Sequence, residues 1–154
     1  MINRNLDGIE MKSALVCILL LLLCISVESA SADTISAQID SQDFPSGDWH
    51  RGQDQADAHV WIKNTGDIGH RFWVSYEVMD RRGQWYTAPP ESVYADPGSD
   101  STWFVGPRLH IPYDAELGSY QADFYLYAYY DSSTGEFSDL LDQVAQVGAF
   151  RVVG

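Results

Sequence analysis

Cysteine is nearly absent from the sequence. The positions of the two cysteines exclude several classes of protein. The two cysteines, Cys17 and Cys24, both lie close to the N-terminus. The chain after Cys24 therefore has no disulfide framework, no thiol nucleophile and no cysteine-based metal site. A fold built from this part of the chain must be held together by packing and hydrogen bonds.

Positive charge is also scarce. The chain has nine Lys and Arg residues against 22 Asp and Glu, which gives a formal net charge of −13 at pH 7. So few cations cannot form the basic patch that nucleic-acid phosphates or anionic lipids require. We therefore expect no nucleic-acid partner, while cations, neutral molecules and proteins remain compatible with the charge.

Only one long hydrophobic run is present, from Ala14 to Val27. It follows Lys12 and precedes Ala30-Ser31-Ala32, a pattern typical of a secretory signal peptide. The run is shorter than the roughly 20 residues that span a bilayer as a helix. We predict a signal peptide over residues 1–32, export to the medium or cell envelope, and no membrane span in the mature form. Two acidic residues before Met11 suit a signal poorly, so Met11 is an alternative start.

Residues 33–154 alternate apolar and polar side chains in short segments, which is typical of β-strands. The clearest segments are His70–Asp80 and Tyr120–Tyr130. Weaker strands are predicted over 34–40, 56–64, 93–95, 101–105, 108–111 and 149–153, and 139–147 is open between a helical turn and an irregular strand. About seven strands separated by turn residues predict one all-β domain, an immunoglobulin-like antiparallel β-sandwich.

Several turns carry a resemblance to a known family. Asn64-Thr65-Gly66-Asp67 follows a predicted strand, Asp96-Pro97-Gly98 precedes another, and Leu117-Gly118-Ser119-Tyr120 opens the Tyr120–Tyr130 strand. In this order the motifs resemble the CARDB-type immunoglobulin-like adhesion modules of archaea and bacteria. The resemblance implies a β-sandwich at the cell surface and transfers no catalytic residues. Tyr120 is also a candidate tyrosine corner, whose hydroxyl would bond a nearby backbone group.

The sequence contains no catalytic motif. The four histidines lack metal-binding spacing, and there is no G-x-S-x-G stretch or phosphate-binding glycine loop. We therefore expect a protein that is not an enzyme and needs no resident cofactor.

A calcium site is a secondary hypothesis, because hard cations prefer carboxylate oxygens. The densest acidic segment contains Asp131, Glu136, Asp139 and Asp142. It departs from the EF-hand pattern, because Glu136 stands where that pattern needs glycine. A solvated turn is the competing interpretation.

Aromatic side chains give the main functional hypothesis. If Phe124 and Leu126 face the core, then Tyr125, Tyr127 and Tyr129 face outward, and the same reasoning places Trp73 outside on His70–Asp80. These two strands are neighbours in an immunoglobulin-like sheet, so the four aromatics would share one exposed face. Stabilisation of the sheet by cross-strand pairs is the structural alternative.

Three binding functions follow for the exported domain. The first is assembly at the cell surface through this aromatic face, with a protein partner or with a second copy of the chain. The second is carbohydrate binding by the same aromatics. The third is protease inhibition by the segment Gln84–Ser92, which contains two prolines.

Overall fold

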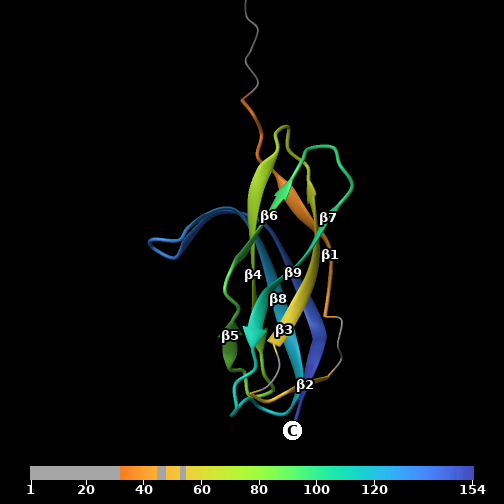
Figure 1. Cartoon of the computed structure of the whole chain (residues 1–154), viewed down its shortest axis with the longest axis vertical. Helices are drawn as coiled ribbons and strands as arrows, with labels where there is room; N and C mark the ends of the chain where they lie inside the picture. The colour runs from red at the N-terminus through yellow and green to blue at the C-terminus, as the bar shows by residue number, and fades with distance from the viewer. Residues whose placement is uncertain (1–31, 45–47, 53–54) are drawn as a thin grey trace, which may run out of the picture. The chain divides into compact units, whose positions relative to one another are not determined.

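The computed structural model describes residues 32–44, 48–52 and 55–154, and Asp33–Gly154 form one compact unit. The predicted signal peptide lies almost wholly outside the described residues. The described ranges contain strands and turns but no helix, so no helix in them could cross a membrane. The strands are β1 (Ala37–Asp43), β2 (Asp48–His50), β3 (Gln55–Asn64), β4 (His70–Met79), β5 (Trp85–Thr87), β6 (Glu91–Ala95), β7 (Thr102–His110), β8 (Gly118–Asp131) and β9 (Glu136–Val153) (Figure 1).

These strands form two sheets. The smaller has the order β1-β3-β7, and the larger has the order β2-β9-β8-β4-β5, with β6 pairing to the other end of β4. The arrangement of β1-β3-β7 against β9-β8-β4 matches the A-B-E and G-F-C strands of an immunoglobulin-like sandwich. The predicted fold class is confirmed, including the pairing of β4 with β8.

The structure corrects two details of the predicted strands and decides one alternative that the sequence left open. The segments 101–105 and 108–111 belong to one strand, β7, because Gly106 and Pro107 fill a bulge opposite β3 and do not end the strand. The segment 139–147 lies within β9, so the irregular strand is the correct one of its two predicted alternatives. The short strand β2 runs parallel to β9, so the larger sheet is not purely antiparallel.

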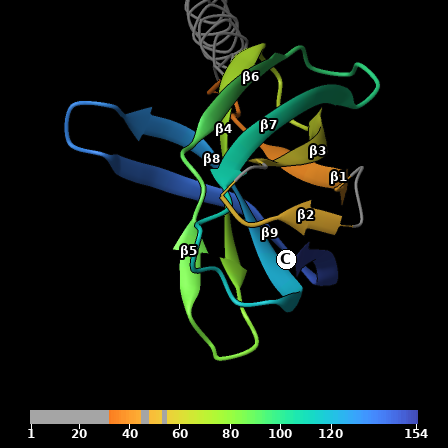
Figure 2. The ribbon, with the colours of Figure 1, turned by 60° about the horizontal axis from the view of Figure 1, so that its bottom comes forward.

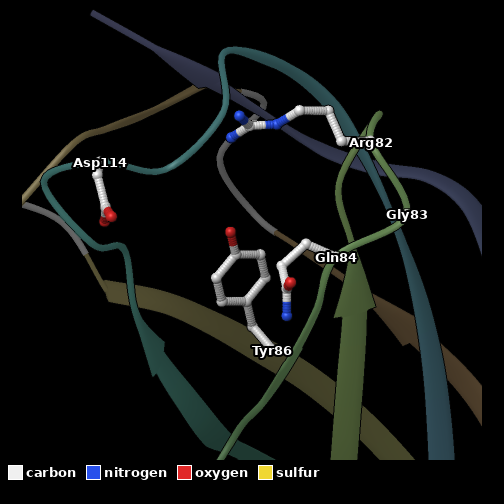
Figure 3. A pocket seen from close by; sticks show the side chains of 5 residues that line it. All are labelled: Arg82, Gly83, Gln84, Tyr86 and Asp114. Carbon is white, nitrogen blue, oxygen red and sulfur yellow. The ribbon is translucent and has the colours of Figure 1, made fainter.

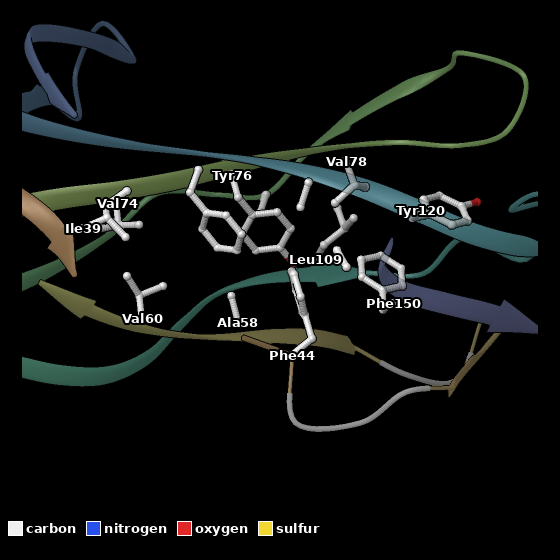
Figure 4. Packing of buried hydrophobic residues seen from close by; sticks show 14 of the residues in the cluster. Ile39, Phe44, Ala58, Val60, Val74, Tyr76, Val78, Leu109, Tyr120 and Phe150 are labelled. Carbon is white, nitrogen blue, oxygen red and sulfur yellow. The ribbon is translucent and has the colours of Figure 1, made fainter. Parts of the chain in front are cut away.

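The core lies between the two sheets, as Figure 4 shows. The alternation predicted for β4 is confirmed, since Phe72, Val74, Tyr76 and Val78 are fully buried. From the smaller sheet, Val60 and Ile62 bury their side chains completely against them. Phe44, just after β1, packs its ring against the rings of Tyr76, Phe124 and Phe150 at centroid distances of 5.5, 5.7 and 5.1 Å. Burial of large side chains from both sheets is the main source of stability in a domain without disulfides.

Tyr120 forms the predicted tyrosine corner. Its side chain is buried and stacked on Phe150, and its hydroxyl donates a hydrogen bond to the Glu116 carbonyl oxygen at 3.0 Å. The bond fixes the loop that leads into β8.

Replacement of Tyr120 by phenylalanine should separate the contribution of the hydrogen bond to stability from that of the ring packing. We expect Tyr120→Phe to lower the free energy of unfolding by about 1 kcal/mol, because the Glu116 carbonyl loses its partner while the ring stays. Urea denaturation gives the measurement. Tyr113→Phe is the matched control, because Tyr113 is 80% exposed, and an equal loss in both variants would contradict the assignment.

Candidate binding surfaces

The predicted aromatic face exists on the outer side of β4 and β8, but its members are not fully exposed. Trp73 lies directly opposite Tyr127 in the strand register, and Ser75 lies opposite Tyr125. Trp73, Tyr125 and Tyr127 are each half-buried. Tyr125 and Tyr127 stack on each other at 6.3 Å. The structure thus brings three of the four predicted residues together.

The fourth predicted residue, Tyr129, lies apart from this group. Its ring meets the edge of the His70 ring at 5.3 Å, and 45% of the residue is exposed. Tyr130 joins the group instead, because its ring lies 5.0 Å from Trp73 and 4.8 Å from Phe137 of β9. Phe137 also stacks on Tyr127 at 4.4 Å. We call this group the hairpin aromatic cluster: Trp73, Tyr125, Tyr127, Tyr130 and Phe137.

Glu77 borders the hairpin aromatic cluster on β4. The Tyr125 hydroxyl lies 3.5 Å from the Glu77 carboxylate. Burial raises the pKa of Tyr125 and of Tyr127, and the negative charge of Glu77 raises both further. Both phenols therefore remain neutral hydrogen-bonding groups across the physiological range.

The end of the β8–β9 hairpin projects from the sandwich as an arm (Figure 2). The register of β4 with β8 ends at Trp73 and Tyr127, so the hairpin beyond this point is two-stranded. Leu140, opposite Tyr127, is 53% exposed and adds to the exposed Tyr129. The arm and its base thus present two large side chains, Tyr129 and Leu140, of which about half is exposed in the described domain.

The acidic residues of the calcium hypothesis do not gather around one point. Asp131 and Glu136 pair at the tip of the arm, whereas Asp142 lies six residues further along β9, roughly 20 Å of extended chain. The Asp131 carboxylate accepts hydrogen bonds from the amide and hydroxyl of Ser133, which lower its pKa. Asp142 accepts the Ile39 amide at 2.7 Å. No cluster of three or more His, Cys, Asp or Glu side chains suited to a metal occurs within the described ranges.

The backbone conformation at position 139 explains why an aspartate occurs there. Its φ angle is 56°, in the left-handed region that asparagine and aspartate tolerate better than other non-glycine residues. It precedes the bulge in β9 that separates the pairs Leu126–Asp142 and Tyr127–Leu140. The turn chemistry of the arm therefore accounts for this aspartate.

A shallow pocket of about 550 Å³ lies beside the turn between β4 and β5 (Figure 3). Its lining residues are Arg82, Gly83, Gln84, Tyr86 and Asp114. The turn is held by Asp80, which is buried and accepts the backbone amides of Arg82 and Gln84 at 2.8 and 2.9 Å. Burial and the nearby Asp80 charge raise the pKa of Tyr86. The lining set contains no paired nucleophile and base.

The segment proposed as an inhibitory loop, Gln84–Ser92, is anchored at its centre. The Ala88 amide donates to the Tyr76 carbonyl at 2.9 Å, and the Ser75 hydroxyl donates to the Ala88 carbonyl at 3.3 Å. Ala88 itself is buried. The middle of the segment therefore follows the body of the sandwich, whereas an inhibitory loop needs to protrude.

Comparison with known proteins finds likeness only in structure. No family model matches the sequence, and no curated protein matches it. Among solved structures, a CARDB domain from Pyrococcus furiosus in complex with di-metal ions is similar over 79% of this chain and 94% of its own, at 14% identity and a TM-score of 0.41. This is the family that the turn motifs of the sequence resemble.

Parts of two enzymes are also similar in structure to this chain. A β-glucuronidase from Bacteroides uniformis matches 75% of this chain at 15% identity and a TM-score of 0.49. A β-glucosidase from Listeria innocua in complex with glucose matches 80% at 16% identity and a TM-score of 0.44. The chain spans only 14% and 16% of the length of these enzymes.

The structure also reveals an aromatic surface that the sequence analysis did not identify. Trp61 of β3 and Trp103 of β7 lie directly opposite each other on the outer face of the smaller sheet. Alternation with the buried Val60 and Ile62 was a usable signal for Trp61. Trp103 had no such signal, because Thr102, Trp103, Phe104 and Val105 do not alternate.

Proposed function

We propose that the chain is an exported, non-enzymatic binding module whose β8–β9 arm contacts a protein at the cell surface, either another protein or a second copy of the chain. The observation that carries this proposal is the exposure of Tyr129, at 45%, on the projecting two-stranded arm and of Leu140, at 53%, at the base of the arm. An isolated hairpin is only marginally stable in water, so a contact that buries these side chains would stabilise the arm.

The composition supports a protein partner. The low number of cations opposes polyanionic ligands, and aromatic and aliphatic residues at the centre of a contact supply most of its binding energy. Export is supported by the N-terminal apolar run and by its small-residue cleavage site.

The alternative of carbohydrate binding by the same aromatics has less support. The rings of Trp73, Tyr127, Tyr130 and Phe137 pack against one another, with Tyr127 stacked on Phe137 and the other pairs tilted. These contacts leave less flat ring surface for stacking on a sugar. Protease inhibition is likewise weakened by the anchored position of Ala88.

The proposal is tested by removing the exposed side chains of the arm. We expect the double variant Tyr129→Ser, Leu140→Ser to lose binding by at least about tenfold, since central apolar contacts are each worth about 2 kcal/mol. Sedimentation velocity measures self-association. For another partner, a photocrosslinker at position 129 captures proteins from the native cell surface, and titration of the captured partner measures its affinity.

The matched control is Trp85→Ser, which removes an aromatic side chain of similar exposure, 43%, from β5. It should leave binding unchanged. A monomeric domain that gives no crosslink from the arm, or a partner that binds the double variant as tightly as the wild type, would disprove the proposal.

A further inference from the structure

The outer face of β1-β3-β7 carries an unpartnered pair of indole rings. Trp61 and Trp103 are cross-strand neighbours with ring centroids 6.4 Å apart and an interplanar angle of 45°. Trp103 is 51% exposed and Trp61 is half-buried. On the opposite side of the sheet, β3 buries Val60 and Ile62 completely and β7 buries Leu109, so the core does not need the indoles.

His59 completes this group at the next outward position of β3. Its ring meets Trp103 edge-on at 5.6 Å and Trp61 at 6.3 Å. The Nδ1 atom of His59 lies 3.2 Å from the Asp43 carboxylate of β1, which fixes the orientation of the imidazole. We call Trp61, Trp103 and His59 the tryptophan platform.

Polar side chains surround the tryptophan platform. Along β3, the outward positions on either side are Asp57, whose carboxylate lies 3.4 Å from the Arg108 guanidinium, and the exposed Lys63. On β1, the exposed Ser41 lies opposite Trp61. The face therefore offers apolar ring surface at its centre and both hydrogen-bond donors and acceptors at its edge.

This combination suits a sugar better than a protein or a polyanion. A hexose presents an apolar face of C–H groups, which the negative face of an indole attracts, and a rim of hydroxyls that need hydrogen-bond partners. A stable protein interface needs a larger apolar centre than two indoles enclosed by ionic groups. The net charge of −13 opposes nucleic acids and acidic glycans.

We propose that the tryptophan platform is a binding site for a neutral polysaccharide. The site lies on the opposite sheet from the β8–β9 arm and does not depend on the function proposed for that arm.

The test uses the purified protein and a panel of neutral polysaccharides: laminarin, barley β-glucan, xylan, galactomannan and pullulan. Native gels that contain each polysaccharide measure retardation, and quenching of tryptophan fluorescence measures affinity. We expect retardation by at least one member and a loss of affinity of about tenfold or more in Trp103→Ala, because a central aromatic contact is removed.

Two controls keep the outcome decisive. Trp85→Ala removes an indole of comparable exposure from the other sheet, and Tyr129→Ser with Leu140→Ser alters the arm. Both should bind polysaccharide as the wild type does. Trp103 is the residue to replace, because half of it is exposed and its removal should leave the domain folded. Failure of the whole panel to retard the protein, unchanged binding by Trp103→Ala, or loss of a dimer or protein partner in that variant in place of sugar binding, would overturn the inference.

Discussion

Replacement of Asn64 by alanine should destabilise the domain by about 3 kcal/mol or more. Asn64 is buried, and its side-chain amide donates to the Ile68 carbonyl at 2.8 Å and to the Ala95 carbonyl at 2.9 Å. Its side-chain oxygen accepts the Gly66 amide at 2.9 Å. Each buried partner left unpaired costs about 1–3 kcal/mol, and alanine would leave three groups without this partner.

The measurement is the urea midpoint at an unchanged m-value. Asn64→Asp tests the direction of the bonds, because it keeps the oxygen acceptor but loses both donated hydrogen bonds and places a carboxylate beside two carbonyls. We expect it to be about as destabilising as alanine. Lys63→Ala is the control at the adjacent exposed position. If Asn64→Ala unfolded at the wild-type midpoint, the buried amide would have no structural role.

The same hydrogen bonds explain why the Asn-Thr-Gly motif could be recognised in the sequence. The Thr65 and Gly66 amides both donate to the Ser36 carbonyl, and a Cβ at Gly66 would collide with the backbone oxygen of Thr34. The motif therefore closes the β3–β4 turn onto the start of β1. Local turn chemistry of this kind is readable from sequence, because residue type and backbone geometry determine each other.

Alternation likewise predicted the inner faces of β4 and β8, because both strands pack against the second sheet throughout the core. Where that condition ends, Tyr129 is exposed as predicted but lies beside His70, and Tyr130 takes the place beside Trp73. Beyond Tyr127 the hairpin has two strands, and such ribbons twist more strongly than a multi-stranded sheet. No second sheet packs against the arm, so alternation along its strands does not predict which side chains are buried.

The tryptophan platform could not be predicted from the sequence, for a different reason. The neighbour relation of Trp61 and Trp103 depends on the register of β3 with β7, which includes the bulge at Gly106 and Pro107. A shift of one residue would move Trp103 to the other face. The bulge changes the register of β3 with β7, and alternation in the sequence does not predict that change. The tryptophan platform could therefore be found only from the structure.

The second large effect is expected at alkaline pH. Burial raises the pKa of Tyr120 to about 12, and burial raises the pKa of Tyr76 further still. In the unfolded chain both phenols ionise near pH 10. Above pH 10 the native state holds more protons than the unfolded state, so the free energy of unfolding falls as the pH rises. Below pH 10 the two phenols are protonated in both states, and their contribution to the free energy of unfolding is fully present. Tyr76 alone should account for a loss of about 3 kcal/mol by pH 12.

The chain is well suited to this experiment, because its nine tyrosines are accompanied by only two lysines, Lys12 and Lys63. Urea titrations at several values between about pH 8 and pH 12 give the slope of stability against pH. Tyr76→Phe should lower stability at neutral pH, because Tyr76 is hydrogen-bonded to the backbone of Leu109 in the facing sheet, yet it should flatten the slope above pH 10. Tyr113→Phe, at an exposed position, should keep the wild-type slope. A slope that is unchanged in Tyr76→Phe would mean that the phenol between the two sheets does not limit stability at high pH.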